Sequence, residues 1–336
     1  LFGSSGAEGV VSNLTSAGEI SGGLGGPKGT TKLGHVGGFV GRLYGKLVNV
    51  TNTGKVKGIA TYNAGVAGFV QQGAVLDGVK NYGEITSSAA YVAGVAAYVY
   101  EDAEFNKCVN YGNISSSVAA GYAAGIAATA LPSKFVECVN EGQISSGSSA
   151  GIVANCSGKS GGLIYTFDRC QNNGEVTGNG ILGGITAVQG ATAGNNVCHY
   201  IQCVNNGDIT ATATQAVSSS AMAGIAAFYS PGSVFEYCIN TGFVTNTKSV
   251  YTAGIAANNK GNATADYPVV FKGCVNTGNI ASSAQQIAGI VAYITNYTSV
   301  DSCLNYGTIE QGIWGAAGIC YTMAGTTSSL TNRINY

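Results

Sequence analysis

One two-part phrase recurs along the chain and constrains its fold more than any other feature. In one copy the first part reads CVNYGNI from Cys108 to Ile114, and the second reads AGI from Ala124 to Ile126. The glycine of the Asn-x-Gly element marks ten units, each 29 to 36 residues after the one before: Gly18, Gly54, Gly83, Gly112, Gly142, Gly174, Gly207, Gly242, Gly278 and Gly307. A repeat of this length describes a stack of similar units rather than a pair of ordinary domains.

The phrase has the periodicity of β-strands. Cys108, Asn110, Gly112 and Ile114 alternate with other residues, so a strand would place all four on its inner face. The second part is a short apolar run, typical of a buried strand. Frequent glycine and the lack of an apolar stripe at helical spacing exclude helical repeats, and propeller blades need about 40 to 50 residues. The pattern predicts an all-β fold, a right-handed parallel β-helix (β-solenoid) of about ten coils with two or three short strands each.

The composition agrees with one elongated domain. We interpret residues 1–336 as a single β-solenoid repeat domain, with a degenerate first coil at 1–45 and the last coil and C-terminal end at 303–336. Charged residues make up only 9%, which is unlike a typical cytosolic enzyme surface, and the net charge of −1 offers no basic field for nucleic acid. The longest nearly apolar run, 89–100, is too short to span a membrane. The start at Leu1 fits a processed chain or an excerpt.

An asparagine stands two residues before the glycine in nine of the ten units, with Ser16 in the first. Stacked asparagines can hydrogen-bond their counterparts above and below, and we expect the glycine that follows to adopt a positive φ at a bend. We also expect the alanine three residues after the second glycine, such as Ala97, to lie where two sheets approach closely. The expected asparagine ladder is Asn52, Asn81, Asn110, Asn140, Asn172, Asn205, Asn240, Asn276 and Asn305.

Seven of the ten cysteines occupy one repeat position, where the first three units have Leu14, Val50 and Val79. This interchange indicates a small apolar site, and a buried free cysteine behaves as a small apolar residue. We therefore expect reduced, buried thiols, because in-register parallel strands rarely give disulfide geometry. No standard zinc spacing occurs, and we expect no metal and no cofactor. The expected cysteine ladder is Cys108, Cys138, Cys170, Cys203, Cys238, Cys274 and Cys303; Cys156, Cys198 and Cys320 lie outside it.

The segment GGFVG from Gly37 to Gly41 resembles the GLUG motif of bacterial surface proteins. The alternating phrases resemble the β-helical repeats of secreted adhesins, and this similarity of pattern covers nearly the whole chain. Most later copies lack the final glycine of the motif; Ala128 stands there in the fourth unit. The resemblance implies an extracellular or cell-surface location and an adhesive role, and it brings no catalytic residues with it.

Enzymatic function is the first alternative, because many polysaccharide lyases and hydrolases are β-helices. Hydrolysis needs two carboxylates and lysis a calcium site with a base. Glu175 and Asp208 hold equivalent positions on successive coils and are the best pair, although solvated strand ends explain them equally well. A G-x-S-x-G match at 147–151 lacks the helix of a nucleophile elbow. We assign no catalytic residue and expect the protein not to be an enzyme.

Passive binding is the second alternative. Tyr82, Tyr111 and Tyr306 hold equivalent positions, and exposed tyrosines suit sugar or protein contacts. Thr177 and Thr210 belong to an outward Ser/Thr row that could bind glycans or ice, or simply be an exposed β-face. The sequence thus predicts an extracellular structural or adhesive solenoid, with the subunit of a surface fibre as one form. We expect it to self-associate end to end or to bind other surface proteins or glycans.

Overall fold

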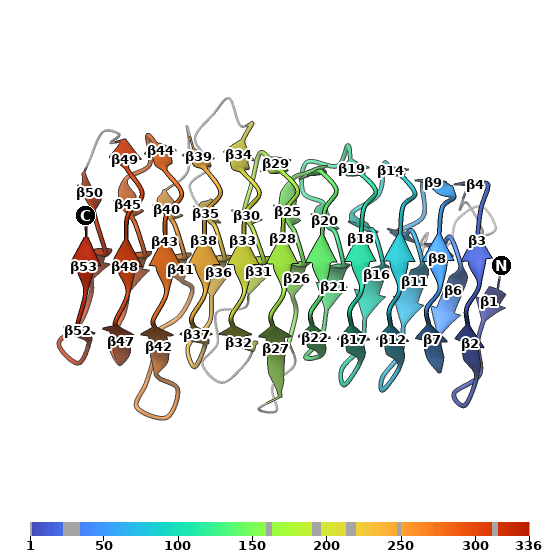
Figure 1. Ribbon diagram of the computed structural model, residues 1–336, viewed down its shortest axis with the longest axis horizontal. Helices are drawn as coiled ribbons and strands as arrows, with labels where there is room; N and C mark the ends of the chain where they lie inside the picture. The colour runs from blue at the N-terminus through green and yellow to red at the C-terminus, as the bar shows by residue number, and fades with distance from the viewer. Residues whose placement is uncertain are drawn as a thin grey trace, which may run out of the picture.

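The computed structural model describes residues 2–22, 34–158, 163–189, 196–212, 220–246, 250–310 and 315–335. These residues contain strands and turns and no helix, so no membrane-spanning helix occurs among them. The strands form a right-handed parallel solenoid whose N- and C-terminal sides lie at opposite ends of the long axis (Figure 1). The all-β solenoid predicted from the repeat is confirmed. Each turn, however, has five short strands instead of two or three, because every turn bends sharply at several points.

The front sheet faces the viewer in Figure 1 and has eleven two-residue strands. Its first residue points outward and its second, usually asparagine, points into the interior. Its strands are β3 (Thr15–Ser16), β8 (Thr51–Asn52), β13 (Lys80–Asn81), β18 (Val109–Asn110), β23 (Val139–Asn140), β28 (Gln171–Asn172), β33 (Val204–Asn205), β38 (Ile239–Asn240), β43 (Val275–Asn276), β48 (Leu304–Asn305) and β53 (Ile334–Asn335).

The upper sheet follows the front sheet in each turn, and its strands from β9 to β44 each place one buried aliphatic residue in the interior, from Val56 to Ile280. Its ten strands are β4 (Glu19–Gly22), β9 (Lys55–Gly58), β14 (Ile85–Ser87), β19 (Ile114–Ser116), β24 (Ile144–Ser146), β29 (Val176–Gly178), β34 (Ile209–Ala211), β39 (Val244–Asn246), β44 (Ile280–Ser282) and β49 (Ile309–Glu310).

The lower sheet precedes the front sheet and supplies the large interior side chains, among them Phe105 and Phe271. Its strands are β2 (Val10–Ser12), β7 (Lys46–Val48), β12 (Val75–Asp77), β17 (Glu104–Asn106), β22 (Lys134–Val136), β27 (Ile164–Asp168), β32 (Val197–Ile201), β37 (Val234–Glu236), β42 (Val269–Lys272), β47 (Thr298–Asp301) and β52 (Ser329–Thr331).

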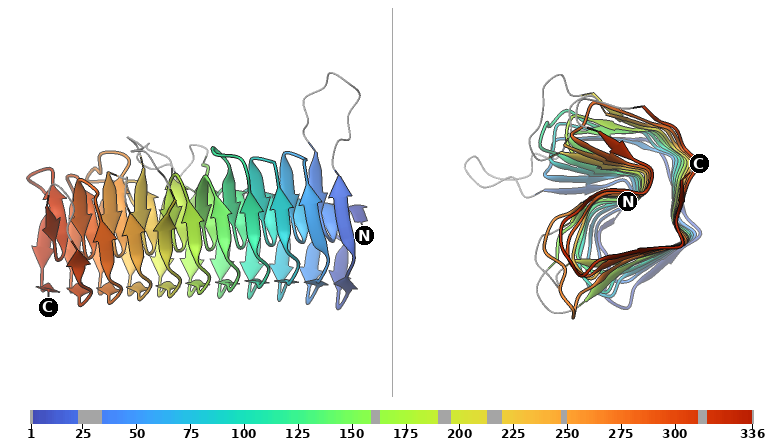
Figure 2. Two further views of the ribbon diagram at one scale, coloured as in Figure 1. Left: turned by 90° about the horizontal axis from the view of Figure 1, so that it is seen from above. Right: turned by 90° about the vertical axis from the view of Figure 1, so that its left-hand side faces the viewer.

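Two rear sheets complete each turn, and together they bend inward toward the front sheet (Figure 2, right). The upper rear strands are β5 (His35–Gly37), β10 (Tyr62–Ala64), β15 (Tyr91–Ala93), β20 (Tyr122–Ala124), β25 (Ser148–Ala150), β30 (Leu182–Gly183), β35 (Ala221–Ala223), β40 (Tyr251–Ala253), β45 (Gln286–Ala288) and β50 (Ala316–Ala317). The lower rear strands are β1 (Phe2–Ser4), β6 (Val40–Leu43), β11 (Ala67–Val70), β16 (Ala96–Val99), β21 (Ala127–Ala130), β26 (Val153–Cys156), β31 (Thr186–Gln189), β36 (Ala226–Tyr229), β41 (Ala256–Asn259), β46 (Val291–Ile294) and β51 (Cys320–Met323).

The inward bend gives the solenoid a waist that divides its interior into two cores. The apex of the bend is the second glycine of the sequence phrase, such as Gly125, which lies directly against the Asn140 amide. Below the waist, the larger core packs the lower, front and lower rear sheets around the phenylalanine and cysteine side chains. Above it, a smaller core packs the aliphatic residues of the upper sheet against the upper rear sheet. The waist therefore depends on side-chain-free backbone at the apex.

The first glycine serves a different purpose from the one expected. Among the described residues, Gly18 has a φ of 101°, but the equivalent glycines from Gly54 to Gly307 do not have positive φ. A Cβ on Gly112 would overlap the carbonyl oxygen of Gly83 on the preceding turn, and the others have the same contact. The expectation of a positive φ at these glycines was wrong, since close stacking of the turns is what excludes a side chain.

The positive φ occurs instead just before the cysteine position, where the lower sheet turns into the front sheet. Gly78 and Gly273 hold this position in two turns. The other described turns place a residue with a side chain there, with φ between 46° and 54°: Asn13, Asn49, Lys107, Glu137, Arg169, Gln202, Tyr237, Ser302 and Asn332. The left-handed conformation costs a residue with a Cβ roughly 1 to 2 kcal/mol. The packed ladders on either side thus impose this bend on the backbone.

Candidate functional site

The asparagines form a continuous hydrogen-bonded ladder inside the solenoid. Each Nδ2 donates to the Oδ1 of the asparagine on the next turn at 2.8 Å, from Asn52 through to Asn305. The same Nδ2 donates to the carbonyl of the glycine two residues on, as Asn110 does to Gly112 at 2.8 Å. The ladder also includes Asn335, which the sequence analysis missed, and begins at Ser16. The expected stacking of asparagines is present, and it satisfies their buried amides.

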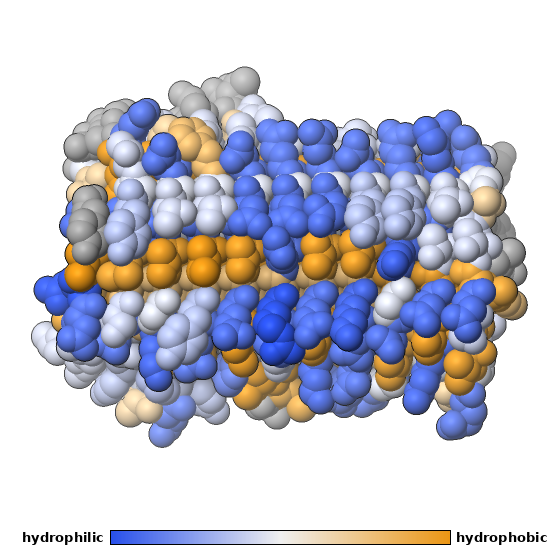
Figure 3. All heavy atoms as spheres, viewed as in Figure 1, coloured by the Kyte–Doolittle hydropathy of each residue, from blue (hydrophilic) through white to orange (hydrophobic). Residues whose placement is uncertain are grey.

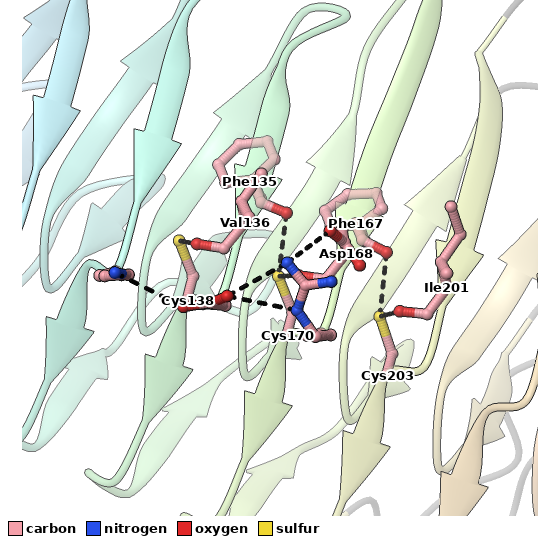
Figure 4. Close-up of polar contacts among 11 residues, drawn as sticks. Phe135, Val136, Cys138, Phe167, Asp168, Cys170, Ile201 and Cys203 are labelled. Carbon is pink, nitrogen blue, oxygen red and sulfur yellow. Dashed lines mark hydrogen bonds and ion pairs between the residues drawn. The ribbon is translucent and has the colours of Figure 1, made fainter.

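The cysteine ladder lies beside it in the larger core. All ten cysteines are free thiols; the seven of the ladder are buried, as are Cys156 and Cys198, whereas Cys320 is half-buried. Figure 4 shows Cys138, Cys170 and Cys203 on successive turns, and their Sγ–H groups donate to carbonyl oxygens of the preceding turn. Burial raises the pKa of the Cys170 thiol. The ladder cysteines are therefore free thiols packed in the core, as expected from their interchange with valine.

An aromatic stack runs parallel to the cysteines and was not anticipated from the sequence. Six rings of the lower sheet lie face to face on consecutive turns, with centroids 4.6 to 5.3 Å apart. The rings belong to Phe105, Phe135, Phe167, Tyr200, Phe235 and Phe271. An aromatic residue three before each of these cysteines was the available signal. The stack thus supplies most of the largest side chains of the larger core.

One member of the carboxylate pair expected of an enzyme, Asp208, caps the backbone of the next turn. Asp208 Oδ1 accepts a hydrogen bond of 2.8 Å from the Phe243 N–H. Asn113 and Asn279 make the same contact at equivalent positions. Glu175 holds the equivalent position on the turn before Asp208, since Val176 pairs with Ile209. Asp208 thus has the structural role that amides have at the equivalent positions.

The front face carries the tyrosines singled out from the sequence. The rings of Tyr82 and Tyr111 stack at 4.5 Å with an interplanar angle of 8°, and both are exposed. Tyr306 holds the same position several turns away, so the structure does not join it to the other two. Below this row runs a band of outward aliphatic side chains, orange in Figure 3, which is interrupted at Lys80 and Gln171.

In the C-terminal half of this face, the outward residues of the front-sheet strands are apolar. We define the front patch as Val204, Tyr237, Ile239, Val275, Leu304 and Tyr306, which lie on adjacent turns of the front sheet or its edge. Tyr237, Ile239 and Tyr306 are exposed. The neighbouring outward residues, Gln202, Asn206, Thr241 and Thr277, are polar and uncharged. By contrast, Lys107, Glu137 and Arg169 form ion pairs along the N-terminal half.

The rear bend encloses a third cluster, formed by side chains that point outward from the two rear sheets. Buried alanines such as Ala154 and Ala187 line its bottom, as expected for the alanine three residues past the second glycine. Toward the N-terminal side its rim is aromatic: Tyr62 stacks on Tyr91 at 4.9 Å and meets Phe69 edge-on. These contacts fill the angle between the two sheets with side chains.

The upper sheet carries the hydroxyl row. Thr177 and Thr210 are directly paired in register on β29 and β34, and both are half-buried. Thr86, Ser115 and Ser145 continue the row on preceding turns. Beside these three serine and threonine residues the surface is hollowed, and one hollow reaches about 500 Å³. The hydroxyl row therefore borders a shallow, open hollow in the lateral surface.

Comparison with known proteins identifies no relative. No protein-family model, no curated protein and no solved structure matches the chain. Within the described ranges, no group of three or more His, Cys, Asp or Glu side chains could hold a metal ion. The two candidate functional surfaces of the described structure are therefore the front patch and the hydroxyl row.

Proposed function

We propose that this protein is an extracellular structural or adhesive β-solenoid that binds protein surfaces through the front patch. The observation that carries the proposal is the exposure of Tyr237, Ile239 and Tyr306 beside the front-sheet strands β33 to β48, none of which contains a charged residue. Exposed contiguous apolar surface of this kind marks interaction sites, and tyrosine is enriched in them. The low overall charge of 9% leaves little repulsion to oppose close approach of another surface.

The interior suits a structural role. Asparagine, cysteine and aromatic ladders run through consecutive turns, so that every turn is bonded to its neighbours by side chains as well as by backbone. Repeat proteins of this type gain stability from contacts between neighbouring units. A rigid rod with flat lateral faces is the form that adhesion or scaffolding requires.

The fibre form of the proposal adds end-to-end association. The asparagine ladder has one direction, since every Nδ2 donates toward the C-terminal side and Ser16 Oγ donates to Asn52 Oδ1 at the other end. Head-to-tail stacking would continue this direction, whereas head-to-head stacking would oppose donors to donors. We therefore expect any filament to be polar, and electron microscopy of concentrated protein tests this form. Dispersed particles without filaments would rule it out.

Adhesion is tested with beads coated with the protein. We expect coated beads to aggregate or to adhere to cells, and the double variant Ile239→Lys, Val275→Lys to lose this behaviour because two charges enter the front patch. The matched control, Thr264→Lys, Ala265→Lys, places two charges in the exposed connection between β41 and β42, outside the front patch and the upper sheet, and should adhere normally. Equal adhesion by the double variant would contradict a role for the front patch. Labelling of intact source cells with a membrane-impermeant reagent tests the extracellular location.

A further inference from the structure

We infer that the upper edge of the solenoid binds an uncharged polysaccharide chain lying along the axis. The site is a trough made of two adjoining hollows of about 500 Å³ and 200 Å³, which share Ser116 and Ser117. It extends from Lys57 on β9 to Thr212 after β34.

The lining of the trough selects for hydroxyl-bearing, neutral ligands. Thr86, Ser115 and Ser145 supply hydroxyl groups, and a hydroxyl can donate one hydrogen bond and accept two. Sugar hydroxyls have the same capacity, so the two surfaces are complementary. Lys57 is the charged residue among those that line the trough, and its Nζ is paired with Glu19 at 3.2 Å. The site therefore offers no free charge to a phosphate or a carboxylate.

Ser146 provides independent support for a ligand. Its side chain is only 7% exposed, it lines the second hollow, and its Oγ has no hydrogen-bond partner within the described structure. At the equivalent position Ser87 donates to Gly58 O at 2.7 Å, and Ser116 donates to Ala89 O at 2.7 Å. A buried hydroxyl without a partner is costly. A sugar hydroxyl entering the hollow would satisfy it.

The lack of an acceptor for Ser146 coincides with a change on the turn before it. Ser87 donates to Gly58 at the end of β9, and Ser116 donates to Ala89 between β14 and β15, so each acceptor lies one turn before its serine. Three residues connect the upper and upper rear strands on each of those turns, whereas five residues connect β19 to β20 on the turn before Ser146. Where this connection lengthens, no carbonyl of the described residues accepts from Ser146 Oγ, which lies beside the hollow.

Register along the trough favours a chain over a single sugar. Thr86, Ser115, Ser145 and Thr177 are paired strand by strand. Equivalent atoms on neighbouring strands lie about 4.8 Å apart, which is comparable to the length of one sugar in an extended chain. A ligand along the axis would therefore meet one hydroxyl per turn. Exposed Ile59 at one end of the trough offers an apolar surface to a sugar ring.

The test is calorimetric titration of the full chain with hexasaccharides of β-glucan, mannan and chitin and with an acidic hexagalacturonate. We expect binding of at least one neutral hexasaccharide, with affinity that falls for the corresponding disaccharide, and no binding of the acidic one. Ser115→Tyr, which fills the trough, should abolish binding. Ser146→Ala should weaken it about tenfold, the equivalent of one hydrogen bond. Thr277→Tyr on the front face is the matched control and should bind normally.

Melting curves of each variant show whether a loss of binding is caused by a loss of folding. Ser146→Ala should melt at or above the temperature of the unmodified protein, because an unsatisfied hydroxyl is removed.

Failure of all neutral oligosaccharides to bind, preference for the acidic one, or unchanged binding by Ser115→Tyr would overturn the inference. So would shaped ice growth by a protein that binds no glycan. The inference does not rest on adhesion through the front patch, since the Ile239→Lys, Val275→Lys variant should bind sugar normally.

Discussion

Gly125 and Asn140 meet at the waist of the solenoid, where a Cβ on the glycine would overlap Oδ1 of the asparagine. Gly94 and Asn110, and Gly151 and Asn172, make the same contact on neighbouring turns. The two parts of the repeated sequence phrase are therefore the two sides of one contact across the interior. This explains why both parts recur while the connections between them vary in length.

Adding one methyl group at this contact tests its importance. We expect Gly125→Ala to destabilise the protein by about 3 kcal/mol or more, because the new Cβ also overlaps the Gly151 carbonyl and backbone on both sides must move. Gly6→Ala is the matched control, since nothing lies within 4 Å of its Cβ position. Chemical denaturation followed by circular dichroism measures both. Equal stability of the two variants would contradict the waist contact.

Much of this architecture was predictable, because a solenoid repeats its contacts and the sequence repeats with them. The alternation of Cys108, Asn110, Gly112 and Ile114 placed all four side chains inside, and they are buried. The interchange of cysteine with Val79 indicated free thiols in a small apolar site. Position-specific residue types thus indicate which face is buried without any knowledge of the turns.

We expect that aspartate, which has the same shape as asparagine, cannot replace an asparagine of the ladder without a loss of stability. In Asn172→Asp a carboxylate would lose both donor bonds, to Asn205 Oδ1 and to Gly174 O, and would place a buried charge beside those oxygens. We expect a loss of about 3 to 5 kcal/mol at neutral pH, the usual cost of an uncompensated buried charge. Burial would raise the pKa of this carboxyl in the folded state, so stability should partly recover as pH falls toward 4.5. Asn173→Asp, on the exposed side of the same turn, is the control.

The backbone bends were less predictable from the sequence. Where packing imposes a backbone dihedral angle, the residue type at that position gives little indication of the angle. The glycine that follows Asn110 in the phrase suggested a positive φ. Glycine is needed there instead because the turns stack so closely that a Cβ on Gly112 would overlap the Gly83 carbonyl. The true left-handed position carries Lys107, Glu137 and Gln202, which no propensity would place there. The trough also depends on connection lengths and on the unpaired Ser146, which appear only once the strands are aligned.

The left-handed position offers a route to a more stable protein. Gln202 has a φ of 51°, and because its side chain is uncharged, its replacement breaks no ion pair. Gly273 holds the equivalent position two turns on. We expect Gln202→Gly to be about 1 kcal/mol more stable than Gln202→Ala, since only glycine adopts this φ without strain. Urea denaturation of the pair isolates the effect of the Cβ. A more stable alanine variant would show that the bend is not strained.

Thiol titration tests the cysteine ladder. Nine of the ten thiols are buried, and burial raises the pKa of the half-buried Cys320 to about 12, so native protein should react slowly with a disulfide reagent. Denatured protein should release ten thiols per chain. Cys203→Val should cost less than about 1.5 kcal/mol, because Val79 occupies the same position. Mass spectrometry without reduction would reveal disulfides and contradict this expectation.

Protonation of His35 should weaken the N-terminal turns. Its Nε2 lies 3.3 Å from Nη2 of Arg42, which can only donate, so the neutral ring is the bonded form. Burial, and next the Arg42 charge, lower the pKa of His35 from its ordinary value of 6.5. The unfolded chain therefore binds a proton first as pH falls. Stability from this group is complete above about pH 6.5 and is lost as pH falls toward the lower pKa of the folded state.

Melting temperatures at pH 8 and pH 5 check this expectation. The unmodified protein should melt at a lower temperature at pH 5, and His35→Asn should lose part of that difference. Desolvation by burial also lowers the pKa of His199, although the Glu236 charge opposes this shift. His199 therefore also makes the protein less stable as pH falls. His199→Asn therefore serves as the comparison, and Arg42→Gln should reduce the difference by removing the second cause. If His35→Asn kept the full pH dependence, the contact with Arg42 would not be what senses the proton.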